Sequence, residues 1–96
     1  MKRFMIFHTL DPGLTRENIS EVSKASQQDP SVRGYRSFLS LTACKGVCIF
    51  EARDRDSLIT WLKNRNLSYD EIVQVELEGE YGKMTDLLAP VGVGSG

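Results

Sequence analysis

The sequence predicts a single α+β domain whose six short elements follow the order β-α-β-β-α-β. Segments rich in aromatic and branched residues, several of them alternating, are separated by segments with apolar residues at helical spacing. The two middle strands are joined by a short connection that contains glycine, which suits a β-hairpin. The chain has 96 residues, enough for one hydrophobic core and too few for two.

The first half of the chain supplies a strand, a helix and a second strand. Residues 2–9 carry aromatic and branched side chains and end at an Asp-Pro-Gly turn signal. Thr15 is a candidate N-cap for a helix over residues 15–28, which has a narrow apolar stripe. The Asp-Pro pair that follows ends this helix. Residues 32–41 then alternate in polarity and predict the second strand.

The second half repeats the pattern in the order strand, helix, strand. Residues 46–52 form an apolar run typical of a buried strand. Asp54 or Asp56 can cap the following helix, which has a broad apolar face. Residues 71–78 alternate and predict the last strand.

These elements predict a ferredoxin-like sandwich. Two right-handed β-α-β crossovers that share a hairpin give an antiparallel four-stranded sheet in the order 4-1-3-2, with both helices on one face. We expect residues 1–82 to form this domain and residues 83–96 to form a flexible tail.

The sheet face opposite the helices is expected to be apolar as well. In the first strand Phe4 and Ile6 point to one side, and Met5 and Phe7 point to the other. A large exposed apolar patch is rare on a monomer, so the equivalent face of a second copy is the simplest cover. We therefore expect a homodimer, of the kind called a dimeric α+β barrel, with a cavity between the sheets as the natural ligand site.

Composition excludes several classes of partner. The net charge is −1, and the 12 basic residues are scattered, which argues against nucleic acid and anionic membranes. No apolar run approaches the roughly 20 residues of a membrane helix, and the first apolar run is too short for a signal peptide. Cys44 and Cys48 are expected to be reduced thiols, so we expect a cytoplasmic protein.

The residues that could carry chemistry gather near one end of the predicted sheet. His8 ends the first strand, and the antiparallel third strand begins beside it, which brings Cys48 near. Glu51 and Asp11 are further candidates for one constellation, and Tyr35 with Glu51 is a candidate ligand contact. An imidazole and a thiolate suit a soft divalent metal or a nucleophile–base pair.

A structural interpretation of both residues stands beside the chemical one. His8 would then be bonded to backbone or water at a strand end, and Cys48 would be a small apolar side chain packed in the sheet. Whether the two share a face depends on a strand register that the sequence does not fix.

The segments "FMIFHTL", "GYRSF", "VCIFEA" and "LSYDEIVQVE" resemble a family of small ferredoxin-like proteins of unknown function, some described as nickel-binding. The resemblance covers roughly residues 2 to 80. In that family a histidine follows the first apolar run, where His8 stands, and a cysteine precedes an aliphatic-x-Glu-Ala, where Cys48, Glu51 and Ala52 stand. It implies the same fold, a dimer, and His8 and Cys48 as ligands of a metal such as nickel.

Three functions follow as hypotheses. The first is a non-catalytic, cytoplasmic homodimeric module that binds a metal ion or a small ligand through His8 and Cys48, with Glu51 as a further candidate. The second is a small cofactor-free enzyme of the monooxygenase or isomerase kind, which the likeness to dimeric α+β barrels implies, with His8 as general base. The third is a non-catalytic interaction domain.

Overall fold

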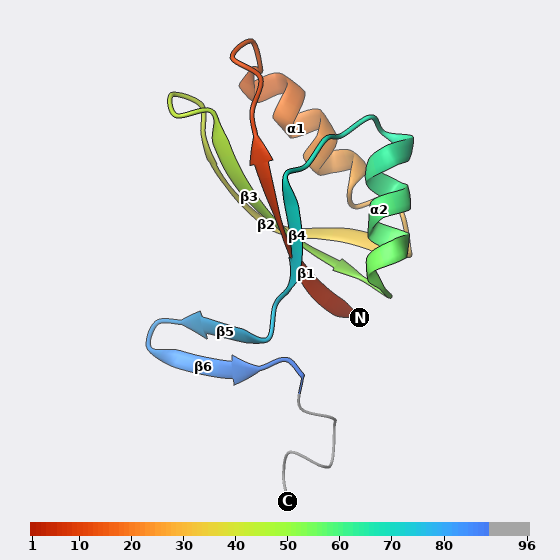
Figure 1. Cartoon of the computed structure of the whole chain (residues 1–96), viewed down its shortest axis with the longest axis vertical. Coiled ribbons are helices and arrows are strands. Elements are labelled where there is room, and N and C mark those ends of the chain that lie inside the picture. The colour runs from red at the N-terminus through yellow and green to blue at the C-terminus, as the bar shows by residue number, and fades with distance from the viewer. Residues whose placement is uncertain (89–96) are drawn as a thin grey trace, which may run out of the picture.

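The computed structural model describes residues 1–88 and confirms the α+β class. Its strands and helices are β1 (Lys2–Thr9), α1 (Arg16–Ala25), β2 (Val32–Ser40), β3 (Lys45–Ala52), α2 (Arg55–Asn64), β4 (Glu71–Gln74), β5 (Leu77–Glu80) and β6 (Lys83–Asp86) (Figure 1). No helix in this part of the chain is both long enough and apolar enough to cross a membrane.

Four strands form the main sheet. Its order is β2-β3-β1-β4, which read from the other edge is the predicted 4-1-3-2, and all neighbouring pairs are antiparallel. Both helices lie on the same face, because Phe50 of β3 packs with the buried side chains of α2 and also lines a cavity beneath α1.

The two helices begin where their capping residues predict. The Thr15 hydroxyl accepts a hydrogen bond from the backbone N–H of Asn18, whose side chain accepts one from the Thr15 N–H. This reciprocal pair satisfies two N–H groups that the first turn of α1 leaves free. Asp54 caps α2 with a single bond, which its side chain accepts from the N–H of Ser57 at 2.8 Å.

The hydrophobic core is built by the main sheet and α2. Trp61 of α2 packs against Phe50 with ring centroids 5.3 Å apart. Helix α1 contributes no buried side chain to this core. The core residues are Phe4, Ile6, Val32, Phe50, Ala52, Leu58, Trp61, Leu62 and Ile72.

The last predicted strand, residues 71–78, is divided in the structure. The N–H of Val75 donates to the carbonyl of Arg3, and beyond this bond the chain leaves the main sheet. A separate hairpin of β5 and β6 follows, and Tyr81 and Gly82, both with positive φ, form its two-residue turn. Residues 83–86, which are part of the predicted flexible tail, therefore form a strand; residues 89–96 of that tail lie outside the described residues.

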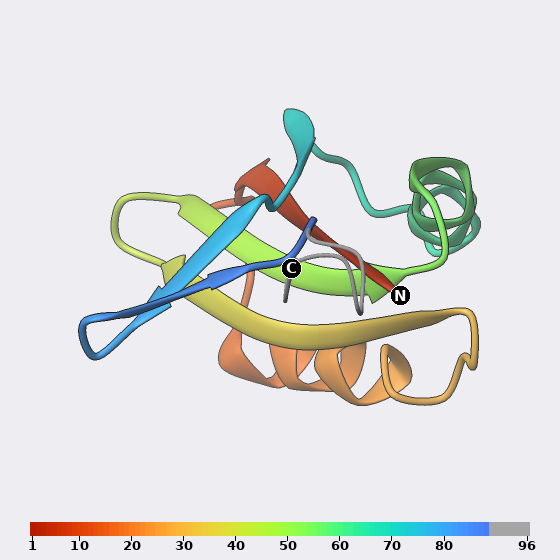
Figure 2. The same ribbon diagram turned by 90° about the horizontal axis from the view of Figure 1, so that it is seen from below.

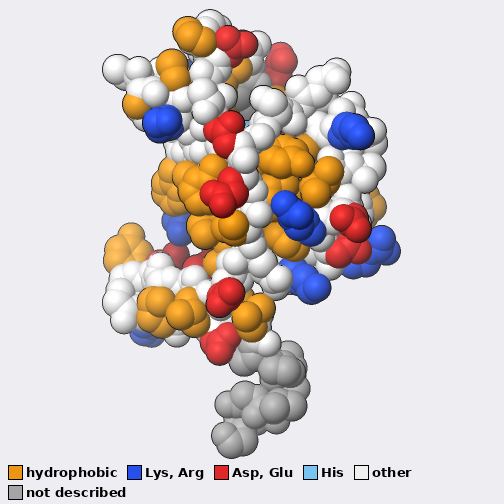
Figure 3. Space-filling view, in the orientation of Figure 1, with side chains coloured by type: hydrophobic (Ala, Val, Ile, Leu, Met, Phe, Trp, Pro, Cys, Tyr) orange, Lys and Arg blue, Asp and Glu red, His pale blue; other side chains and the backbone are white. Residues whose placement is uncertain are grey.

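Ion pairs connect this hairpin to the main sheet. Arg3 of β1 pairs with Glu78 at 2.7 Å, and Arg36 of β2 pairs with Glu80 at 3.2 Å. The tip of the hairpin points away from α2 (Figure 2). Hydrophobic side chains lie at the surface of this part of the molecule (Figure 3). The exposed large hydrophobic residues from the hairpin onward are Leu77, Tyr81, Met84 and Leu88.

Candidate functional site

His8 is held at the end of β1 by the loop that precedes β4. Its Nδ1 lies 2.9 Å from the carbonyl oxygen of Ser68, and because a carbonyl only accepts, Nδ1 carries the proton. The loop is fixed in turn by the N–H of Asp70, which donates to the carbonyl of Phe7, and by its carboxylate, which accepts from Thr9. The other ring nitrogen, Nε2, is left with its lone pair for a metal or a hydrogen-bond donor.

Cys48 is half-buried in the middle of the sheet. Burial raises the pKa of its thiol, and a hydrogen bond with Ser37 opposes this shift only in part. The side chain is therefore a neutral thiol near pH 7. The other cysteine, Cys44, lies in the β2–β3 connection, where its thiol contacts the carbonyl of Leu41.

The strand register places His8 and Cys48 on the same face. Cys48 is directly opposite Ile6 across the β1–β3 pair, and His8 follows Ile6 by two residues. Residues two apart in a strand point to the same side, so His8 and Cys48 are diagonal neighbours beneath the helices. The structure thus brings together the two residues that were predicted as metal ligands.

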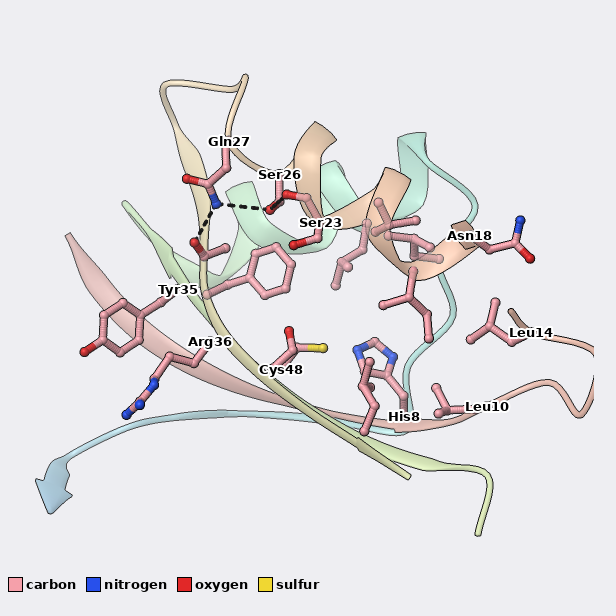
Figure 4. A pocket seen from close by; sticks show the side chains of 18 residues that line it. His8, Leu10, Leu14, Asn18, Ser23, Ser26, Gln27, Tyr35, Arg36 and Cys48 are labelled. Carbon is pink, nitrogen blue, oxygen red and sulfur yellow. Dashed lines mark hydrogen bonds between the residues drawn. The ribbon is translucent and has the colours of Figure 1, made fainter. Parts of the chain in front are cut away.

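A cavity of about 460 Å³ lies between α1 and this face, and both side chains line it (Figure 4). The polar residues Asn18, Ser23, Ser26, Gln27 and Ser37 lie along its rim and walls. Its apolar walls come from α1, the sheet, α2 and the connecting loops. The apolar residues are Leu10, Leu14, Ile19, Val22, Leu39, Phe50, Leu62 and Leu67.

Helix α1 closes the cavity as a roof that is anchored at its C-terminal end. The N–H of Gly34 donates to the carbonyl of Ser26, and the Gln27 side chain donates to the carbonyl of Gly34 at 2.7 Å. A side chain at Gly34 would meet the Ser26 hydroxyl, so glycine is what permits this close approach of α1 and β2.

The remaining predicted site residues lie elsewhere. Glu51 is opposite Arg3, on the other face of the sheet, and bonds its guanidinium at 3.2 Å. The Tyr35 ring also contacts Arg3, whose central guanidinium carbon lies 4.1 Å from the ring centroid. Figure 4 shows the Tyr35 side chain pointing away from the cavity, although the residue is among those that line it. Arg3 therefore contacts both of these side chains.

Of the expected constellation of His8, Cys48, Glu51 and Asp11, the structure brings together only His8 and Cys48. Asp11 lies in the turn after β1 and does not line the cavity. Within residues 1–88, no group of three or more His, Cys, Asp or Glu side chains is placed to hold a metal ion. The sequence did not predict the role of the Ser68 carbonyl, because a backbone acceptor leaves no sequence signal. It also did not predict that side chains of α1 line the site.

The sequence model of a family described as nickel responsive protein SCO4226-like matches residues 4–75. The match spans most of the chain, from β1 to the end of β4, and includes His8 and Cys48. Searches of curated proteins and of solved structures give no significant match.

Proposed function

Since the chain belongs to the nickel responsive protein SCO4226-like family, we propose that it is a cytoplasmic, homodimeric ferredoxin-like module that binds a soft divalent metal ion, nickel first, at His8 and Cys48. One observation carries the proposal. The imidazole and the thiol extend from neighbouring strands into the same cavity.

The chemistry of these two donors suits nickel. Imidazole nitrogen and thiolate sulfur are both ligands of first-row metals at the soft end of the series. The hydrogen bond from His8 Nδ1 to the Ser68 carbonyl is the kind of contact that orients a ligating histidine and fixes its tautomer. The thiol of Cys48 would lose its proton on binding, so affinity should rise with pH.

The number of donors indicates an exchangeable site. A closed structural site takes about four protein ligands, whereas this cavity offers two in the part of the chain that the structure describes. Water or a small molecule would complete the coordination. Such a site suits a protein that responds to a changing metal concentration better than one that stores metal permanently.

The open sheet face supports the homodimer. By register, an apolar patch lies on the side of the main sheet away from the helices, and its members are at least partly exposed. An exposed apolar patch of this kind on a small protein is typical of an interaction surface, and a second copy offers a matching surface. We define the open sheet face by Met5, Phe7, Phe38, Val47, Ile49 and Val73.

Nickel titration of protein purified without an affinity tag tests the metal site. We expect saturable binding, a near-ultraviolet absorption band from the nickel–thiolate bond, and a higher melting temperature. His8→Ala and Cys48→Ser should lose at least the band and most of the affinity. Cys44→Ser is the matched control, because Cys44 lies outside the cavity. The metal proposal is excluded if wild type and His8→Ala respond to nickel in the same way.

A further inference from the structure

We infer that the cavity beneath α1 takes a neutral, largely apolar small molecule whose single hydroxyl or N–H group points at His8. This inference rests on the proposal that the cavity is a binding site, and it names the class of organic ligand that the site would accept. Volume, charge and the positions of polar atoms lead to it independently of the metal.

The volume exceeds what a metal ion needs. A water molecule takes about 30 Å³, so an ion with four waters would fill roughly a quarter of the space. The whole cavity, at about 460 Å³, falls in the range of pockets that hold small organic molecules. Apolar side chains on α1 and the sheet surround the rest, which favours an apolar body over a polar one.

The absence of a counter-ion favours a neutral ligand. Arg36 is the one Lys, Arg, Asp or Glu residue among the described residues that line the cavity. Its side chain points outward (Figure 4), and its guanidinium pairs with Glu80. While the His8 imidazole is neutral, a carboxylate or an ammonium group inside would lose hydration with no opposite charge to replace it.

Several polar groups that line the cavity already have hydrogen-bond partners. Ser26 donates to the carbonyl of Ser23, and Gln27 donates to both Ser26 and Gly34, so the polar groups at the C-terminal end of α1 already bond one another. His8 instead presents Nε2 as an acceptor, with the weak S–H donor of Cys48 nearby. A ligand with one donor group would place it against His8 and its apolar body beneath α1.

Helix α1 has the properties of an adaptable roof. Its side chains Ile19 and Val22 line the cavity yet remain partly exposed, and none of its residues is fully buried. An apolar molecule beneath the helix would bury this stripe and so gain free energy from both surfaces.

Titration of the ¹⁵N-labelled full chain with 1-naphthol, followed by NMR, tests this inference. We expect saturable shifts at residues lining the cavity. The matched anion 1-naphthoate should bind about tenfold more weakly or worse. Shifts confined to the open sheet face, no saturable shifts, or equal binding of the anion would overturn the inference.

Two pairs of variants locate the bound probe. Val22→Trp and Ile19→Phe add bulk inside the cavity and should weaken 1-naphthol binding by about tenfold or more. Glu21→Trp and Ser20→Phe add the same bulk on exposed positions of α1 and should leave it unchanged. Full affinity in both folded cavity variants would contradict the inference, and the second cavity variant decides the matter if the first does not fold.

The outcome is separable from that of the metal proposal. Nickel binding is read by the thiolate band, and 1-naphthol binding is read by NMR on metal-free protein. A protein that binds 1-naphthol but does not bind nickel would support this inference and contradict the metal proposal. Nickel binding with no saturable response to 1-naphthol would do the reverse.

Discussion

The Nδ1 atom of His8 lies 2.9 Å from the carbonyl oxygen of Ser68, so one contact joins the end of β1 to the loop before β4 and leaves Nε2 as the ring nitrogen that is available to a ligand. Both the metal proposal and the organic ligand depend on this tautomer, because each uses Nε2. The first prediction tests it directly.

We expect neutral His8 to carry its proton on Nδ1. The Ser68 carbonyl can only accept, so the alternative tautomer would lose this bond and place two acceptors together. Long-range ¹H–¹⁵N NMR correlation of the imidazole, above the pH at which it is protonated, distinguishes the two forms. A signal pattern of the Nε2–H tautomer would contradict the assignment of Nε2 as the ligand atom.

Cys48 should be alkylated by iodoacetamide only at high pH. Burial raises the pKa of its thiol, and only the thiolate reacts. Mass spectrometry of the Cys48 peptide should give a rate profile with its midpoint above the ordinary thiol value of about 8.5. A midpoint at or below that value would show that the side chain is not desolvated.

The same shift has a consequence for stability. Below the ordinary thiol pKa both folded and unfolded chains hold the proton, and the contribution of Cys48 is fully present. As pH rises, the unfolded chain releases its proton first, so the free energy of unfolding should fall until the folded pKa is passed.

Gly34→Ala should destabilise the fold by about 1–3 kcal/mol, as overpacking of a close contact does. The added methyl group would meet Ser26 and push the C-terminal end of α1 away from β2. Urea unfolding gives the difference. Gly13→Ala is the control, because nothing lies within 4 Å of the corresponding methyl position. An equal loss of unfolding free energy in both variants would show that the close contact is not the cause.

Ile49→Lys should convert the proposed dimer into a monomer. Ile49 is central in the open sheet face, and a charge there would be buried against the second copy without a partner. Sedimentation velocity measures the effect at micromolar concentration. Lys63→Glu, an exposed change on α2, should keep the dimer. A wild-type chain that sediments as a monomer at every concentration would rule out the pairing.

Most of the fold could be predicted from local patterns, because its helices and strands obey capping and periodicity. Thr15 and Asp54 begin the helices as their side chains predict. The division of the last strand into β4 and β5 could not be predicted. The alternation of Val73, Val75 and Leu77 continues across the division, whose position depends on where the chain leaves β1. The pattern records side-chain polarity and carries no information about the neighbouring strand.

The candidate site was predictable in its chemistry and less so in its geometry. His8 and Cys48 were found from residue type and strand ends, but their common face required the register. Glu51 could have been excluded, because it follows Cys48 by three residues in one strand and so points to the opposite side. The position of Tyr35 could not be foreseen, since a β-bulge between Gly34 and Arg36 alters the alternation there.

The division of labour between the helices has an evolutionary consequence. The core is complete without α1, which is held chiefly by contacts at one end. Substitutions along the inner surface of this helix can therefore change the lining of the cavity at little cost to folding. Relatives with the same sheet could differ in the shape and polarity of this cavity through changes in a single ten-residue segment.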